Sequence, residues 1–132
     1  MEIRMVDAFE IKGVKNAVFP HHPRQNFKVR LASWLRERGF GRQRCFLVAE
    51  LEGKALGYLV GVLAHATGKL EDFFVATNGG MGEAAQSLME IFEVLCLERD
   101  CKSILAPIWM DEMLIITRGF KLSGSEYVKI LG

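Results

Sequence analysis

The feature that most constrains this chain is an apolar stretch that runs into a glycine-rich turn and then into a helical pattern. The stretch covers Leu70 to Val75, the turn covers Gly79 to Gly82, and the helical pattern covers Glu83 to Glu98. The first amides of a helix have no intrahelical acceptor, the helix dipole adds positive charge there, and glycines let a ligand approach the backbone. A strand, a loop and a helix in this order predict a site for an anionic group such as phosphate.

The remaining strands are predicted from short apolar runs rich in Val, Leu, Ile and Phe. Glu52-Gly53-Lys54 separates two of these runs and predicts a tight hairpin. Gly57 and Gly61, within the second arm of this hairpin, indicate a bend or a close backbone contact. The expected strands, besides the one at Leu70, are Ile3 to Val6, Cys45 to Leu51, Ala55 to Ala64, Lys102 to Ile108 and Glu126 to Leu131.

Helices are predicted where apolar residues recur at intervals of three and four. Asp7 can cap a helix that reaches about Phe19, and Arg24 to Arg38 is amphipathic. Asp111 can cap a short helix that ends at Gly119. In the helix after the glycine-rich turn, one face carries the apolar residues that should pack on a sheet: Ala84, Leu88, Ile91, Phe92 and Leu95.

The bulk properties exclude several classes of protein. At 132 residues the chain has the length of one domain, so we expect residues 1–132 to form a single domain. The 17 basic and 16 acidic residues nearly cancel, so no overall field attracts nucleic acid or an anionic membrane. The longest apolar run, Leu56 to Ala66, is too short to cross a bilayer, and no signal-peptide pattern is present. We expect a cytoplasmic protein that binds neither nucleic acid nor membrane.

The cysteines and histidines predict no metal site. Cys45, Cys96 and Cys101 form no Cys-x-x-Cys pair and lie in apolar or helical stretches, which is typical of buried reduced thiols. His21 and His22 are adjacent, so they point in different directions, and no further ligand stands at a suitable spacing.

The segment around Gly82-Glu83-Ala84 resembles the pyrophosphate loop of GNAT-type N-acetyltransferases, written Arg/Gln-x-x-Gly-x-Gly/Ala. The preceding strand resembles the fourth strand of that family, and Gly119-Phe120 resembles the Gly-Phe that closes its last helix. Two positions depart from the family pattern. Gly79 occupies the Arg/Gln position, and Ile115 stands where many members carry a tyrosine general acid.

The resemblance implies an α/β fold with a mixed, mostly antiparallel central sheet of about six strands flanked by helices. The fourth and fifth strands of the family splay apart, and Pro107 is compatible with this because it lacks an N–H for ladder pairing. The implied cosubstrate is acetyl-CoA, with Phe74 and Val75 offering strand backbone. The implied diphosphate loop contains Gly79, Gly80, Met81, Gly82, Glu83 and Ala84.

Acetyl transfer to an amine requires a group that takes up a proton, and Glu71 and Asp72 are the candidates. Neighbours on a strand point to opposite faces, so only one of the two is expected to face the cleft. The family often uses a glutamate in this strand, which favours Glu71. A solvated or structurally paired carboxylate is the alternative for either residue.

The sequence leaves the acceptor open, as a small-molecule or peptide amine. His21 to Phe27 and Trp109 could line its pocket. One alternative is a catalytically degenerate GNAT-fold protein that acts as a binding or regulatory module. A second alternative is a structural domain that forms a homodimer by pairing an apolar final strand with a partner chain.

Overall fold

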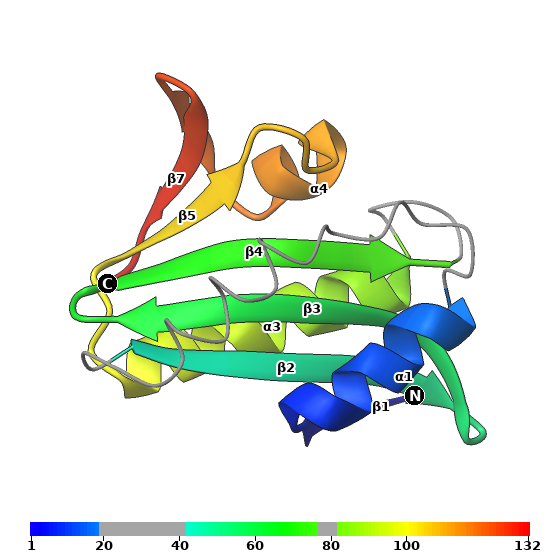
Figure 1. The fold of residues 1–132 in the computed structure, drawn as a ribbon. Coiled ribbons are helices and arrows are strands. Elements are labelled where there is room, and N and C mark those ends of the chain that lie inside the picture. Colours follow the sequence, from blue (N-terminus) through cyan, green and yellow to red (C-terminus); the bar gives the residue numbers. More distant parts are fainter. Residues whose placement is uncertain (19–41, 77–81) are drawn as a thin grey trace.

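The computed structural model describes residues 1–18, 42–76 and 82–132 (Figure 1). The expected helix from Arg24 to Arg38 and the loop residues Gly79, Gly80 and Met81 lie outside the described residues. The described helices are α1 (Ala8–Val18), α3 (Glu83–Glu98) and α4 (Glu112–Thr117). The expected helix after the glycine-rich turn is confirmed with the same bounds.

The described residues form a seven-stranded sheet in the order β1-β2-β3-β4-β5-β7-β6. Every neighbouring pair is antiparallel except β4 and β5, which run parallel. The mixed, mostly antiparallel α/β fold is therefore confirmed. The strands are β1 (Glu2–Val6), β2 (Arg42–Leu51), β3 (Lys54–Ala64), β4 (Thr67–Val75), β5 (Ser103–Pro107), β6 (Lys121–Ser123) and β7 (Glu126–Ile130).

The strand β6 was not predicted from the sequence; it has only three residues and begins shortly after the end of α4. Gly119, with φ +91°, ends α4, and the amide of Phe120 donates to the carbonyl of Ile115 at 3.1 Å. Lys121 to Ser123 then pair with β7. Because β6 pairs with Glu126 to Val128, β7 is not an edge strand, and the expectation that the final strand lies at an edge is wrong. Dimerisation itself stays a prediction.

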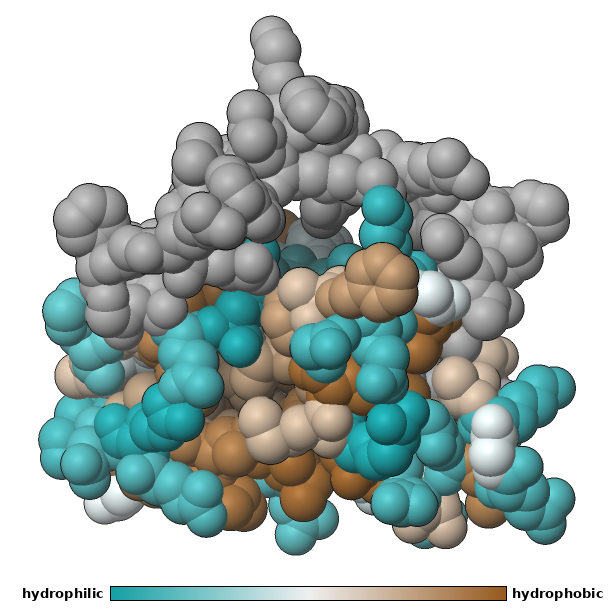
Figure 2. All heavy atoms as spheres, turned by 60° about the horizontal axis from the view of Figure 1, so that its bottom comes forward, coloured by the Kyte–Doolittle hydropathy of each residue, from teal (hydrophilic) through white to brown (hydrophobic). Residues whose placement is uncertain are grey.

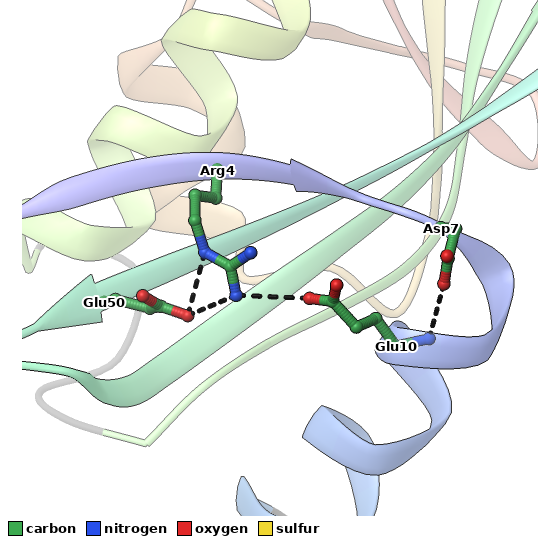
Figure 3. Close-up of polar contacts among 4 residues, drawn as sticks. All are labelled: Arg4, Asp7, Glu10 and Glu50. Atoms are coloured by element: carbon green, nitrogen blue, oxygen red, sulfur yellow. Dashed lines mark hydrogen bonds and ion pairs between the residues drawn. The ribbon is translucent and has the colours of Figure 1, made fainter.

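The start of α1 is fixed by side-chain contacts that join it to the first two strands (Figure 3). The carboxylate of Asp7 accepts a hydrogen bond from the amide of Glu10 at 2.7 Å, which confirms the expected cap. The guanidinium of Arg4 on β1 donates to Glu50 on β2 at 2.7 Å and lies 3.2 Å from the carboxylate of Glu10. These contacts set how α1 leaves β1 and crosses the sheet.

Helices cover both faces of the sheet: α1 lies in front of it and α3 behind it in Figure 1. The larger core fills the α3 side and includes Leu59 and Leu70 from the strands, Phe92 from α3 and Leu114 from α4. A smaller core fills the α1 side and consists of Ile11, Val48, Tyr58 and Val60. This arrangement fixes which strand residues face which helix.

Glycines on β3 and β4 allow α3 to approach the sheet closely. A Cβ atom added to Gly61 would lie within 3.0 Å of ring carbons of Phe92, and one added to Gly68 would lie within 3.0 Å of the sulfur of Cys96. Phe92 and Cys96 are four residues apart and so share one face of α3. The close contact expected at Gly61 is confirmed.

The strand β1 forms one edge of the sheet, as expected for Ile3 to Val6. This edge lies at the lower border of Figure 1. Figure 2 shows the molecule with that border turned toward the viewer, and apolar residues lie in the middle of this face between hydrophilic ones. Met5 on β1 and Phe9 at the start of α1 are exposed. Within the described residues, no helix is both long and apolar enough to span a membrane.

Candidate functional site

The central feature of the site is the separation of the two parallel strands. β4 and β5 pair at Thr67–Ser103, Gly68–Ile104 and Lys69–Leu105, and their pairing ends there. β4 continues to Val75 alongside β3, whereas β5 follows β7 to Pro107. In Figure 1, β5 and β7 rise away from β4. The expected splay is therefore confirmed, and we call the region between the diverging parts of β4 and β5 the wedge.

The N-terminus of α3 lies just beyond the end of β4. Its N-cap residue, Gly82, has an extended backbone (φ −69°, ψ 157°) and no side chain caps the helix. Ala84 and Ala85 are buried, and Glu83 is exposed. The first amides of the helix are donors without intrahelical acceptors, and Gly82 adds no side chain there. These residues fit a diphosphate, although the carboxylate of Glu83 stands close to where its negative charge would lie.

A β-bulge in β4 changes the directions of the two candidate carboxylates. Val60 pairs with Asp72 and Gly61 pairs with Leu70, so Glu71 is an extra residue on β4. Leu70 and Phe73 both pack into the core on the α3 side. Glu71 and Asp72 lie between them and both face the α1 side, where their partners are found. Neighbouring residues on a regular strand point to opposite faces, and this expectation is wrong for Glu71 and Asp72 because the bulge interrupts the alternation.

Glu71 forms an ion pair with Arg44, which lies on β2, and this pair is on the side of the sheet that α1 covers. The guanidinium nitrogen and the carboxylate oxygen are 2.5 Å apart. The side chain of Arg44 is 10% exposed and that of Glu71 is 26% exposed. Glu71 is thus held in place by a largely buried cation while its side chain remains partly exposed.

Asp72 is engaged more fully than Glu71. Its carboxylate lies 2.7 Å from the ammonium of Lys15 on α1, accepts a hydrogen bond from the amide of Phe73 at 2.9 Å, and is hydrogen-bonded to the hydroxyl of Tyr58. Its side chain is 15% exposed. Burial, together with the adjacent Asp72 carboxylate, raises the pKa of Tyr58 above its ordinary value. Asp72 therefore joins α1 to β3 and β4, which is the role of a structurally paired carboxylate.

Phe74 and Val75 occupy the part of β4 beyond its pairing with β5. The ring of Phe74 lies 6.3 Å from that of Tyr58 and packs in the smaller core, whereas Val75 packs against the larger core. Their side chains are therefore structural. Any contact with a cosubstrate would come from their backbone, as the resemblance implies.

No tyrosine stands where a general acid is expected. Ile115, in the tyrosine position of the family pattern, is fully buried in the larger core. Tyr127 is also in that core, on the α3 side of the sheet. Tyr58 lies on the other side with its hydroxyl bonded to Asp72. Trp109, suggested for an acceptor pocket, follows β5 and is exposed. His21 to Phe27, suggested for the same pocket, lie outside the described residues.

The three cysteines are free and buried between the sheet and α3, as the sequence predicts. Burial raises the pKa of Cys45 from its usual value to about 11 and also raises the pKa of Cys96. Thiols in this state are poor nucleophiles at neutral pH because the thiolate is the reactive form. Among the residues that the structure describes, no three His, Cys, Asp or Glu side chains are placed to hold a metal ion.

Two further glutamates near the site were not predicted from the sequence. Glu93 on α3 is 7% exposed and pairs with Arg118 and with Lys129. Glu126 on β7 has a buried carboxylate oxygen, Oε2, with no hydrogen-bond partner among the described residues. Because its neighbour Tyr127 faces α3, Glu126 faces the other side of the sheet, the side of Glu71 and Asp72. A glutamate in a helix or a strand looks like a solvated residue in sequence, and only the long-range packing distinguishes these two.

Comparison with known proteins supports the fold but at low sequence identity. No protein-family model matches the sequence, and no curated protein matches it. Among solved structures, an acetyltransferase of the GNAT family from Staphylococcus aureus Mu50 is similar with a TM-score of 0.70 and 12% identity, over 99% of this chain and 100% of that one.

Two further structures are similar over nearly their whole length. A ribosomal-protein-alanine N-acetyltransferase from Brucella melitensis matches with a TM-score of 0.68 and 19% identity, over 99% of this chain and 100% of that one. An aminoglycoside 6'-N-acetyltransferase from Enterococcus faecium matches with a TM-score of 0.68 and 9% identity, over 98% and 97%. The splayed parallel strands, the helix that follows β4 and these likenesses together define the fold of this chain. It is the GNAT acetyltransferase fold.

Proposed function

We propose that this protein is an acetyl-CoA-dependent N-acetyltransferase that moves the acetyl group directly to a primary amine. The observation that carries the proposal is the wedge. β4 leaves β5 after Lys69 and continues to Val75, and α3 then begins at Glu83 with an N-terminus that no side chain caps. An extended thioester fits between separated strands, and a diphosphate fits uncapped helix amides.

Each part of the cosubstrate has a place in this proposal. The amides of Gly82, Glu83 and Ala84 would hold the diphosphate, together with Gly79, Gly80 and Met81, which lie outside the described residues. The backbone of Phe74 and Val75 would bind the pantetheine arm and orient the acetyl group. Acetyl-CoA supplies a thioester that an amine can attack, and the protein's contribution is to hold the two reactants together.

Glu71 is the proposed proton acceptor. An amine must lose a proton to form the amide N–C bond, while the C–S bond breaks and the thiolate takes up a proton from water. Glu71 suits this role better than Asp72 because its side chain is more exposed and fewer groups engage its carboxylate. The buried cysteines argue for direct transfer, since a thiol intermediate would need a reactive thiolate.

The acceptor is an amine of a small molecule or a peptide. Of the similar proteins, one is named as an aminoglycoside acetyltransferase and another as a ribosomal-protein-alanine acetyltransferase. This fold therefore accommodates both small-molecule and protein amines. In the present chain, Glu71, Asp72 and Glu126 face the same side of the sheet, and cations already pair with the first two. Glu126, which has a buried oxygen without a hydrogen-bond partner among the described residues, would therefore be the carboxylate that attracts a protonated amine beside the wedge.

The proposal is tested by calorimetry with acetyl-CoA and by CoA release with a panel of amines. We expect saturable binding of acetyl-CoA, and we expect release of CoA that depends on the presence of one class of amine. Failure to detect binding at millimolar acetyl-CoA would contradict the proposal.

A second candidate function is a binding module that retains the cosubstrate site but not catalysis. The burial of Ile115 in the position of the family's tyrosine favours it. Binding of acetyl-CoA without acetylation of any amine in the panel would support this candidate over the enzyme.

A further inference from the structure

We propose that Glu93 is a positioning residue that sets the opening between β4 and β5, an inference that rests on the proposed acetyl-CoA site in that wedge. The walls of the wedge belong to two parts of the chain. One wall is β4, and the other is the C-terminal segment, residues 103–130, which contains β5, α4, β6 and β7. Glu93 lies on α3, behind the sheet, and contacts this segment.

The carboxylate of Glu93 is buried and is shared by two cations of the C-terminal segment. Its Oε2 pairs with the guanidinium of Arg118, the C-cap residue of α4. Its Oε1 lies 2.8 Å from the ammonium of Lys129 on β7. Among the described residues, these are the ion pairs that join α3 to the C-terminal segment.

These pairs act where the direct link between the walls is short. β4 and β5 pair over three positions, ending at Lys69 and Leu105. β5 is in turn held by β7, in which Lys129 pairs with Ile104. The position of Lys129 against α3 therefore controls the direction in which β7 and β5 leave β4. Arg118 fixes α4 to the same point.

A buried carboxylate imposes a geometry in a way that an apolar contact does not. A buried carboxylate without its partners is strongly unfavourable, so orientations of the C-terminal segment that separate Glu93 from Arg118 and Lys129 are disfavoured. The helix that carries Glu93 also supplies the amides at its N-terminus. Through Glu93, the diphosphate-binding end of α3 and the far wall of the wedge are held in one arrangement.

The first experiment measures the wedge without any ligand. Spin labels on Lys54→Cys, at the start of β3, and Ser125→Cys, before β7, report the distance between the two parts of the protein; both positions are exposed. The native thiols are buried and react slowly by comparison. We expect one narrow distance distribution in the otherwise native protein and a broader or shifted one in Glu93→Gln.

Lys129→Gln provides a second variant in case Glu93→Gln does not fold, because it leaves Arg118 paired with Glu93. The matched control is Lys121→Gln, which removes the charge of an exposed lysine on the neighbouring strand β6. We expect a changed distance distribution in Lys129→Gln and an unchanged one in Lys121→Gln. A distribution that is the same in folded Lys129→Gln as in the native background would overturn the proposal.

The second experiment measures acetyl-CoA binding to the same variants at a temperature where each is folded. We expect the dissociation constant to rise roughly 3- to 30-fold in Glu93→Gln and Lys129→Gln but not in Lys121→Gln. If Glu93 only stabilised the fold, the variants would lose stability while the distance and the affinity stayed unchanged. If the unmodified protein bound no acetyl-CoA, the proposed function would fail, and the label distances would still decide the role of Glu93.

Discussion

The phenyl ring of Phe92 on α3 lies against Gly61 of β3, in the space that any side chain at that position would fill. We therefore expect Gly61→Ala to force α3 away from the sheet and to lower the free energy of unfolding by about 1–3 kcal/mol. Urea denaturation of the purified variant measures this change.

The matched control is Gly13→Ala in α1, where an added Cβ atom meets nothing within 4 Å. Alanine is a better helix former than glycine, so this variant should gain about 0.5–1 kcal/mol. Equal effects of the two substitutions would show that α3 does not pack on Gly61 as described.

Gly61 also shows which contacts can be predicted from the sequence and which cannot. A glycine within an apolar strand predicts close contact, but Phe92 could be identified as its neighbour only from the packing of α3. Caps at Asp7 and Asp111 were predictable because they depend on residues a few positions away. The bulge at Glu71 was not, since it depends on the register between β3 and β4, and the buried pairing of Glu93 with Lys129 depends on contacts 36 positions apart.

Removing the negative charge at the start of α3 should strengthen acetyl-CoA binding. Glu83 is exposed in the first turn, next to the proposed diphosphate site. We expect Glu83→Gln to bind acetyl-CoA roughly 2- to 5-fold more tightly at low salt, because repulsion is relieved, and the gain to shrink as salt screens the charges. Its stability should fall by about 0.3–1 kcal/mol, since an acidic residue in the first turn favours the helix.

The control for this prediction is Glu90→Gln, an exposed charge two turns further along α3. Its affinity for acetyl-CoA, measured by calorimetry, should equal that of the native protein. Weaker binding by Glu83→Gln would show that the diphosphate does not lie at this end of the helix.

The two carboxylates on the α1 side should differ in their effects on catalysis. Glu71→Gln removes the proposed proton acceptor, so kcat should fall roughly 10²- to 10⁴-fold while acetyl-CoA binding is kept. Asp72→Asn loses the ion pair with Lys15, so its main effect should be a lower free energy of unfolding. Steady-state kinetics with a confirmed amine and urea denaturation measure the two effects. Unchanged turnover in Glu71→Gln would remove Glu71 from the mechanism.

Stability should fall in alkaline solution because of a buried thiol. Burial raises the pKa of Cys45 from 9.0 to about 11, so between these values the unfolded chain loses this proton while the folded chain keeps it. The unfolded state then binds fewer protons, and this group lowers the free energy of unfolding by about 1.4 kcal/mol per pH unit from pH 9 to 11. Below pH 9 its contribution is constant.

Cys45→Ala isolates this contribution. In urea denaturation at several pH values, the free energy of unfolding should fall less steeply above pH 9 for the variant than for the native protein. At neutral pH the two free energies should differ only by a constant amount. Cys96 and Tyr58, whose pKa values burial also raises, should leave part of the slope in place. Identical slopes would show that Cys45 is not buried as described.

The most direct test of the account asks whether the start of α3 holds the diphosphate of acetyl-CoA. Amide signals in a ¹H–¹⁵N spectrum, followed as acetyl-CoA is added, report this residue by residue. The account predicts saturable shifts at Glu83, Ala84 and Ala85, together with Phe74 and Val75 on β4. Saturable shifts elsewhere that leave the α3 amides unmoved, or no shifts at millimolar acetyl-CoA, would contradict it.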